Sequence, residues 1–588
     1  MDFIKRVLST VVGIFVFLFV CFFLLLIMVG ILVGSSSNEK IKIENNSVLN
    51  LDLDFPLLDN AGTLEFKDLP FFTQENNNGL FDLTKAIKEA AHDDRIKGIV
   101  IQSPVNKAGI TQLKALRSAL EEFKDSGKFV EAYMENYTQS DYYLSSVADS
   151  IYLNPIGGVD FKGLATELLY FKDLEEKTGV KFEVFRVGKY KSAVEPFIDN
   201  KMSDANREQI TAYLTSLWKN ISAEIASSRA LSTAHLDSVA DHLLARQAEG
   251  ALKEGFVDKL AYRDEFEADL KKLTHTKDED ELHQIDIVKY IEGTKSSTKS
   301  KSKEGKIAVI YAQGQIYDKD GSISRIAPDQ LVPAIKKARE DKEVKAIVLR
   351  VNSPGGSALA SELIWRELEI TKREKPVVVS MGDVAASGGY YISSGADRIF
   401  AEPTTITGSI GVFGLLPHFK ALTDKIGVHA EQVKTHENAI FYSPFKEVSD
   451  NQRQFITEEI VKIYQTFKTR VSEGRELPMD SVETLAQGRV WTGEQALQNG
   501  LVDELGGLDE ALHYAAEKAN LKTYQIQTLP KFEIDPSKLL QRYGFGLNEK
   551  VFLKKTLGKE LYPIYKDIKE AVEYKGSELL LPYKTIMD

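Results

Sequence analysis

The chain contains the same segment twice, and this repeat constrains its fold more than any other feature of the sequence. The stretch DDRIKGIVI at 93–101 matches DKEVKAIVL at 341–349, an offset of 248 residues. The same offset aligns YYLSSVADSIYLNP at 142–155 with YYISSGADRIFAEP at 390–403. A register that stays constant over about 100 residues indicates a duplicated domain. The polar, basic stretch 295–306 lies between the copies and is typical of a flexible linker.

Each copy alternates short apolar runs with amphipathic stretches, which predicts an α/β fold. In the second copy we expect four strands, KIAVIYA (306–312), KAIVLRV (345–351), PVVVSM (376–381) and RIFAEP (398–403). Helices are expected over 357–374 and 385–396. Alternation of this kind predicts a mainly parallel sheet covered by helices.

The repeat also predicts the domain organisation. The expected segments are an N-terminal segment at 1–40, a first repeat domain at 41–294, the linker at 295–306, a second repeat domain at 307–530, and a C-terminal segment at 531–588. The C-terminal segment is charged and aromatic, and the sequence assigns no role to it.

An apolar stretch near the N-terminus predicts a membrane anchor. Residues 11–33 contain no charged side chain, and as a helix they would extend about 35 Å, enough for a hydrocarbon core of about 30 Å. Lys5 and Arg6 precede the stretch, so the N-terminus is expected in the cytoplasm and the body on the other side. The alternative is a signal peptide cleaved near 34–37, but cleavable apolar regions usually have about 7–15 residues.

The composition of the chain argues against several classes of partner and cofactor. The 74 Lys and Arg residues against 86 Asp and Glu residues give a net charge of −12, which argues against a nucleic-acid partner. The single cysteine, Cys21, excludes an internal disulfide framework and a cysteine-based metal cluster. The nine histidines show no H-x-x-x-H spacing, so we expect no metal, and no cofactor signature is present.

Candidate reactive residues lie where the two copies differ. Ser387 follows an expected strand in GDVAASGGYY and is expected at a helix N-terminus, where backbone N–H groups favour developing negative charge. A second turn, VNSPGGS at 351–357, frees backbone amides through its glycines. Ser387 corresponds to Gln139 in the first copy, and Pro354-Gly355 to Asn106-Lys107. A helix-capping serine and a simple turn are the structural alternatives, but loss of both features from one copy favours a functional role.

A serine nucleophile needs a base. No histidine or acid near Ser387 in the sequence stands out for this role. Lys191, within GKYKSAVEPF of the first copy, corresponds to Ala439 in the second copy. Each copy therefore carries one candidate part and lacks the other, although a single lysine is by itself most simply a surface residue.

Four separated segments, GDVAASGGYYIS, GKYKSAVEPF, VNSPGGS and TGSIGVFG at 407–414, together resemble signal peptide peptidase A, also called protease IV, in its long duplicated bacterial type. The resemblance implies tandem ClpP/crotonase-like domains behind one N-terminal transmembrane helix. It implies a membrane-anchored serine endopeptidase that degrades cleaved signal peptides with a Ser/Lys dyad. It further implies a homotetramer shaped like a bowl, held in the bacterial inner membrane with its catalytic body on the periplasmic side.

The resemblance also implies roles for individual residues. Ser387 would be the nucleophile and Lys191 the general base. Ser409 would orient the lysine. The oxyanion hole would be formed by Gly355, Gly356 and Gly388. Which of the two turn glycines donates stays open. Lys189 differs from some family members and offers a second lysine near the proposed base.

Two other functions stay open. A crotonase-type acyl-CoA enzyme would also use paired backbone amides as an oxyanion hole. An inactive scaffold that binds peptides is the second alternative. Within the peptidase hypothesis, His436 is an alternative base.

Overall fold

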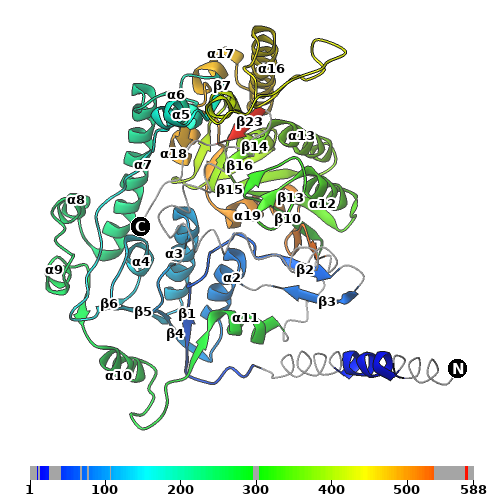
Figure 1. Ribbon diagram of the computed structural model, residues 1–588. Helices are drawn as coiled ribbons and strands as arrows, with labels where there is room; N and C mark the ends of the chain where they lie inside the picture. The colour runs from blue at the N-terminus through cyan, green and yellow to red at the C-terminus, as the bar shows by residue number, and fades with distance from the viewer. Residues whose placement is uncertain are drawn as a thin grey trace.

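The computed structural model describes residues 10, 13–24, 41–66, 69–75, 78–105, 107–295, 304–534 and 577–580. Within these residues the chain folds into two α/β bodies, one for each repeat, with helix α3 lying where they meet (Figure 1). Each body is built on a largely parallel sheet whose strands are covered by helices, as the strand–helix alternation predicts.

The first repeat contains a six-stranded parallel sheet in the order β8-β6-β5-β4-β1-β9. Its strands are β1 (Ser47–Leu51), β4 (Ile96–Ile101), β5 (Phe129–Met134), β6 (Ser150–Leu153), β8 (Lys259–Leu260) and β9 (Gln284–Asp286). Its helices are α2 (Leu80–Ala91), α3 (Ile110–Lys124), α4 (Gln139–Ser145), α5 (Lys172–Thr178), α6 (Glu195–Ile198), α7 (Asp204–Arg229), α8 (Thr233–His242), α9 (Ala248–Lys253), α10 (Arg263–Leu273) and α11 (Ile287–Lys295), with a 3-10 turn η1 at Ser192–Val194.

The second repeat contains an eight-stranded sheet that is parallel except where β19 joins β17. Its strands are β10 (Lys306–Gln313), β13 (Val344–Ser353), β15 (Val377–Ala386), β16 (Arg398–Ala401), β17 (Ile406–Gly408), β19 (Val490–Thr492), β20 (Glu504–Leu505) and β21 (Gln525–Leu529). Its helices are α12 (Pro328–Glu340), α13 (Ala358–Lys372), α14 (Gly388–Ser393), α15 (Lys420–Lys425), α16 (Asp450–Arg475), α17 (Met479–Leu485), α18 (Gly493–Gln498) and α19 (Leu508–Lys518). β13 and β15 are apolar and almost wholly buried, because helices cover both of their faces.

The duplicated sequence folds into duplicated elements. The first residues of helices α3 and α13 are 248 positions apart, and so are their last residues. Strands β6 and β16 have the same offset. The long helices α7 and α16 have 26 residues each and are offset by 246 residues, where the register of the repeat slips. The internal repeat is therefore a repeat of structure as well as of sequence.

Two expectations about the second copy were wrong in detail. The helix expected over 385–396 is shorter, because Ala385 and Ala386 belong to β15 and α14 begins at Gly388. The turn VNSPGGS contains a short strand, β14 (Gly355–Ser357), which pairs with segments far away in the chain. At the expected linker, Lys295 is helical and Lys306 begins a strand, while 296–303 lie outside the described residues.

A third sheet joins the two repeats. Its order is β12-β11-β14-β23-β18-β7, from β12 (Arg325–Ile326), β11 (Gln315–Ile316), β14, β23 (Ser577–Leu580), β18 (Val412–His418) and β7 (Lys181–Val187). The first-repeat strand β7 lies antiparallel to the second-repeat strand β18, with Val187 opposite Val412. Phe185 of β7 is buried in the hydrophobic core of the second repeat. The first repeat thus contributes a strand to the second body.

The described residues of the C-terminal segment, 531–534 and 577–580, form two strands that contact both repeats. β22 (Phe532–Ile534) pairs with β2 (Thr63–Phe66), which also pairs with β3 (Leu69–Glu75). β23 lies between β14 and β18 and is antiparallel to both. The C-terminal segment, to which the sequence assigned no role, therefore completes the third sheet.

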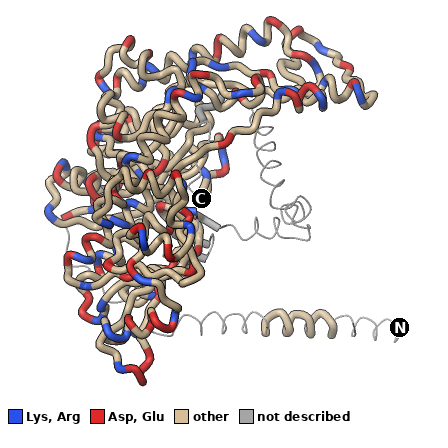
Figure 2. Tube along the Cα trace, turned by 90° about the vertical axis from the view of Figure 1, so that its left-hand side faces the viewer, with Lys and Arg blue, Asp and Glu red and all other residues tan. Residues whose placement is uncertain are grey.

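The expected anchor falls mostly outside the described residues. Residues 13–24 are helical and their large apolar side chains are exposed, whereas 11, 12 and 25–33 are not described. Figure 2 shows this helix as an uncharged stretch projecting from a body on which acidic and basic residues are interspersed. Among the residues that the structure describes, no helix combines the length and apolar character needed to cross a bilayer.

Candidate active site

Ser387 lies at the junction between β15 and α14 in a strained backbone conformation. Its φ of 54° and ψ of −114° are rarely adopted by a residue with a side chain. Its N–H donates to the Gly408 carbonyl at 2.8 Å, which holds the junction against β17. The serine precedes the first helical residue, so its side chain stands at a strand-to-helix turn. It is fully buried in the described structure.

Lys191 reaches Ser387 from the other repeat. It follows β7 and lies 196 residues from the serine in the chain, yet its Nζ is 2.8 Å from the Ser387 Oγ. The lysine side chain is fully buried. Burial disfavours the charged ammonium and lowers the pKa of Lys191 well below its ordinary value. The lysine is therefore suited to accept a proton.

Ser409 is the second contact of the lysine. The Lys191 Nζ lies 3.1 Å from the Ser409 Oγ and 3.2 Å from the Ser409 carbonyl oxygen. Ser409 follows β17 with a positive φ of 51°, and its N–H donates to the Arg489 carbonyl at 2.7 Å. The Lys191 amine therefore lies within hydrogen-bonding distance of both Ser387 and Ser409.

The turn that contains Gly355 and Gly356 lies next to Gly388, the residue that follows Ser387. Gly388 begins α14, so its N–H has no acceptor within the helix. A side-chain carbon placed on Gly388 would lie 3.2 Å from the Gly355 Cα, so the two backbones are adjacent. The Gly355 N–H donates to the Ser353 hydroxyl at 3.2 Å, whereas Gly356 follows with a φ of 148°. The two turns to which the resemblance assigns the oxyanion hole therefore have adjacent backbones.

The first copy fills the equivalent position with a different side chain. Gln139, at the position of Ser387, is buried, and its Oε1 accepts from the N–H groups of Lys162 and Gly163. Its Nε2 donates to the Gly163 carbonyl at 3.0 Å. In the first copy this position therefore holds a side chain that bonds to the backbone of residues 162 and 163.

The alternative bases lie elsewhere. Lys189 is exposed, and its Nζ lies 5.0 Å from the centre of the Tyr190 ring. His436 is exposed in the segment between α15 and α16 and contacts Thr435. Of the candidates named from the sequence, Lys191 is the one that the fold brings to Ser387.

Comparison with known proteins identifies the family. The model of peptidase family S49 matches residues 122–277 and 369–522, once in each repeat. The chain belongs to peptidase family S49. It is a serine peptidase with a duplicated S49 domain.

Several relatives align with this chain over most of their length. Protease 4 of Haemophilus influenzae is 39% identical over 512 residues, covering 84% of this chain and 82% of the relative. Protease 4 of Salmonella typhi is 42% identical over 460 residues, covering 76% and 73%. The chloroplastic serine protease SPPA of Arabidopsis thaliana is 31% identical over 460 residues, covering 77% and 68%. The resemblance to signal peptide peptidase A is confirmed at the level of the family.

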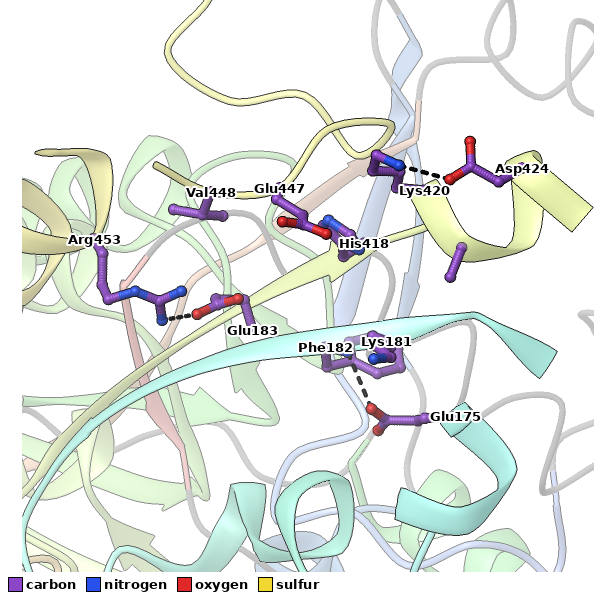
Figure 3. Close-up of a pocket in the computed structure, with 11 residues that line it drawn as sticks. Glu175, Lys181, Phe182, Glu183, His418, Lys420, Asp424, Glu447, Val448 and Arg453 are labelled. Atoms are coloured by element: carbon purple, nitrogen blue, oxygen red, sulfur yellow. Dashed lines mark hydrogen bonds and ion pairs between the residues drawn. The ribbon is translucent and has the colours of Figure 1, made fainter. Parts of the chain in front are cut away.

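A separate cavity of about 350 Å³ lies at the far end of β7 and β18. Figure 3 shows His418 beside Glu447 in this cavity, with Arg453 paired to Glu183 at its side. His418 is mostly buried, and burial lowers its pKa. The candidate site lies at the opposite end of β18, and none of its residues lines this cavity. Among the described residues no group of three His, Cys, Asp or Glu side chains could hold a metal ion.

Proposed function

We propose that this S49 peptidase is a membrane-anchored endopeptidase in which Ser387 is the nucleophile and Lys191 the general base. The observation that carries the proposal is the 2.8 Å distance between the Lys191 Nζ and the Ser387 Oγ inside a fully buried site. An amine acts as a base only when it is uncharged, and burial favours that form of Lys191. The close contact and the burial of the amine both support assigning this pair to acyl transfer.

The proposed reaction has two stages. The Ser387 hydroxyl donates its proton to the neutral Lys191 amine as its oxygen attacks the carbonyl carbon of the scissile peptide bond. The protonated lysine then gives that proton to the leaving amine, and an acyl-enzyme forms on Ser387. A water molecule gives a proton to Lys191 as it attacks the ester, and the protonated lysine returns that proton to the Ser387 oxygen as the bond to the acyl group breaks and the acid product leaves. Ser409 would keep the amine aimed at Ser387 through both stages.

The developing oxyanion would be stabilised by backbone N–H groups of Gly388 and of the Gly355-Gly356 turn. Removing one such donor from a serine protease typically costs about 3–4 kcal/mol of transition-state stabilisation. The Gly355 N–H donates to the Ser353 hydroxyl, and Gly356 pairs with β11 and β23, so we assign the oxyanion to this turn without choosing between its two glycines. The strained φ of Ser387 keeps its hydroxyl close to both turns.

The expected substrate is an extended peptide chain. The backbone of β23 lies antiparallel between β14, which carries the glycine turn, and β18. A peptide that took the same path would form main-chain hydrogen bonds on both sides and pass beside Ser387. Such binding suits extended apolar peptides, including cleaved signal peptides, and excludes folded proteins.

The remaining parts of the proposal concern organisation. We assign ClpP/crotonase-like repeat domains to 41–294 and 307–530, with the lysine supplied by the first and the serine by the second. Residues 11–33 would anchor the chain in the bacterial inner membrane and hold the body on the periplasmic side. Exposed apolar side chains around α15 and α16 supply surface for assembly into the expected homotetramer; they are Ile426, Val428, Phe445 and Phe455.

The test uses the full-length protein in detergent and fluorogenic peptides with small or apolar residues before the scissile bond. Ser387→Ala and Lys191→Ala are expected to abolish hydrolysis while circular dichroism stays unchanged. Lys189→Ala, which removes an exposed lysine two residues away, is the matched control and should retain activity. Activity in Lys191→Ala would remove the lysine from the mechanism. Failure of the unaltered protein to react with a serine-directed probe would favour the peptide-binding scaffold.

A further inference from the structure

A buried glutamine connects the lysine segment to the second repeat. Gln209 lies on α7 and is 1% exposed. Its Nε2 lies 3.0 Å from the Tyr190 carbonyl oxygen and 3.0 Å from the Ser192 Oγ, the residues on either side of Lys191. Its Oε1 accepts from the Val490 N–H at 3.3 Å. One side chain therefore binds both flanks of the lysine and a strand of the other repeat.

The strand that Gln209 contacts also holds the rest of the site. Val490 begins β19 and lies opposite Gly408 of β17. The Gly408 carbonyl accepts from the Ser387 N–H. The carbonyl of Arg489, the residue just before β19, accepts from the Ser409 N–H. Hydrogen bonds thus connect the two neighbours of Lys191 through Gln209 to β19, and from there to the backbone of Ser387 and Ser409.

Apolar packing keeps α7 against this junction. Side chains of α7 form one hydrophobic cluster with the second repeat, made of Ile210, Tyr213, Leu217, Ala386, Ile406 and Val490. Ala386 directly precedes Ser387, so the cluster packs next to the nucleophile. The Tyr190 N–H donates to the Gln487 carbonyl at 2.8 Å and closes the lysine segment from the other side. Gln209 lies beside this apolar cluster and adds hydrogen bonds to the lysine segment and to β19.

We propose that Gln209 is a positioning residue that fixes the Lys191 amine relative to Ser387 across the boundary between the repeats. This inference rests on the proposed Ser/Lys mechanism. An amide side chain suits the role because it donates to the lysine segment and accepts from β19 at the same time. A carboxylate of the same size has no hydrogen to donate, and an apolar side chain leaves buried groups of both segments without partners.

The consequence of losing Gln209 is a misplaced base. Small displacements of a catalytic group cost up to about 100-fold in rate. We expect Gln209→Met and Gln209→Glu to lower kcat roughly 10- to 100-fold with little change in KM. A loosened lysine segment would admit water, so the pKa of Lys191 would rise toward its ordinary value. Because the neutral amine is the active form, the rise of kcat/KM with pH would then occur at higher pH in Gln209→Met.

Ser216→Ala supplies a matched control. Ser216 lies two helical turns further along α7, is mostly buried, and its Oγ is 3.0 Å from the Thr492 Oγ1 of β19. This substitution removes a hydrogen bond between α7 and the same strand without touching the lysine segment. It should leave kcat and the pH midpoint unchanged even where it lowers thermal stability.

The experiment compares pH profiles of kcat and KM for the unaltered protein, Gln209→Met, Gln209→Glu and Ser216→Ala, with active enzyme titrated by a serine-directed probe. Reduced kcat per titrated serine in both Gln209 variants, with a raised pH midpoint in Gln209→Met and neither effect in Ser216→Ala, would support the proposal. Full kcat in both Gln209 variants, or equal losses in Ser216→Ala, would overturn it. Full activity in Lys191→Ala, measured alongside, would instead show that the underlying mechanism is wrong.

Discussion

Replacing Lys191 with Met should remove activity and change how stability depends on pH. Met keeps the length and most of the volume of the side chain, so the site stays packed. Loss of one member of a catalytic pair that acts as a unit typically lowers kcat by about 10⁴- to 10⁶-fold. The fully buried amine also contributes a second, independent signature, because its protonation differs between the folded and unfolded chain.

The direction in which stability changes with pH follows from the proton that Lys191 takes up when the chain unfolds. In the folded protein the pKa of Lys191 is lowered by burial, whereas in the unfolded chain it returns to about 10.4. Between those two pKa values unfolding takes up a proton, so the free energy of unfolding increases with pH by about 1.4 kcal/mol per pH unit. The contribution is complete above the unfolded pKa and is lost as the pH falls toward the folded pKa. Lys191→Met lacks this dependence.

The slope of the free energy of unfolding against pH tests the burial of the amine better than the stability at one pH does. Removing the amine leaves the hydroxyls of Ser387 and Ser409 without a partner, which costs about 1 kcal/mol each but does not vary with pH in this window. Over two pH units inside the window the unaltered protein should gain about 2.7 kcal/mol relative to Lys191→Met. In a domain of this size that corresponds to a change of roughly 5–10 °C in the Tm difference.

The assay is thermal unfolding of both proteins in matched buffers from about pH 6 to about pH 9, with Lys189→Met as the exposed control. The Tm of Lys189→Met should follow that of the unaltered protein at every pH. Parallel curves for the unaltered protein and Lys191→Met would refute the reasoning, because they would mean that Lys191 carries its charge in the folded state.

Two further substitutions and one truncation test other parts of the site. Gly388→Ala places a carbon 2.7 Å from the Ser361 Oγ and 3.2 Å from the Gly355 Cα, so it should displace the oxyanion donors. Steady-state kinetics should show kcat lowered about 10²- to 10³-fold. Gly293→Ala, whose added carbon would lie 3.4 Å from the Ile41 side chain, is the control and should keep its activity. Ser409→Ala removes an acceptor that favours the protonated amine, so the pKa of Lys191 should fall further and the rise of kcat/KM should move to lower pH; an unmoved midpoint would contradict the assigned contact. Ending the chain at residue 576 removes β23 from its place between β14 and β18, which should lower KM for extended peptides, and an unchanged KM would show that substrates do not use that edge.

Much of the architecture was predictable because it is encoded locally. Strands such as β13 and helices such as α13 follow from the period of apolar residues, and the offset of 248 residues places their counterparts in the first repeat. The position of Ser387 after a buried strand could be read in the same way. The errors at α14 and at β14 arose because an unusual φ and a pairing with a distant strand leave no periodic signal.

The site itself was predictable as a set of residues but not as a geometry. The contrast between the copies singled out Ser387 and allowed Lys191 as a partner, while the resemblance assigned their roles. No pattern pointed to Gln209, because an isolated glutamine on a long helix resembles many others. Its importance depends on hydrogen bonds to residues 17 and 281 positions away.

By itself, therefore, the sequence determined the duplicated α/β framework, the apolar N-terminal stretch and the short list of reactive residues. The tertiary structure decided that β7 crosses to the second repeat, that β23 lies beside the glycine turn, and that Lys191 is buried against Ser387. The physical reason is that periodicity records which face of an element is buried, whereas strand exchange and the desolvation of an amine depend on contacts between segments far apart in the chain.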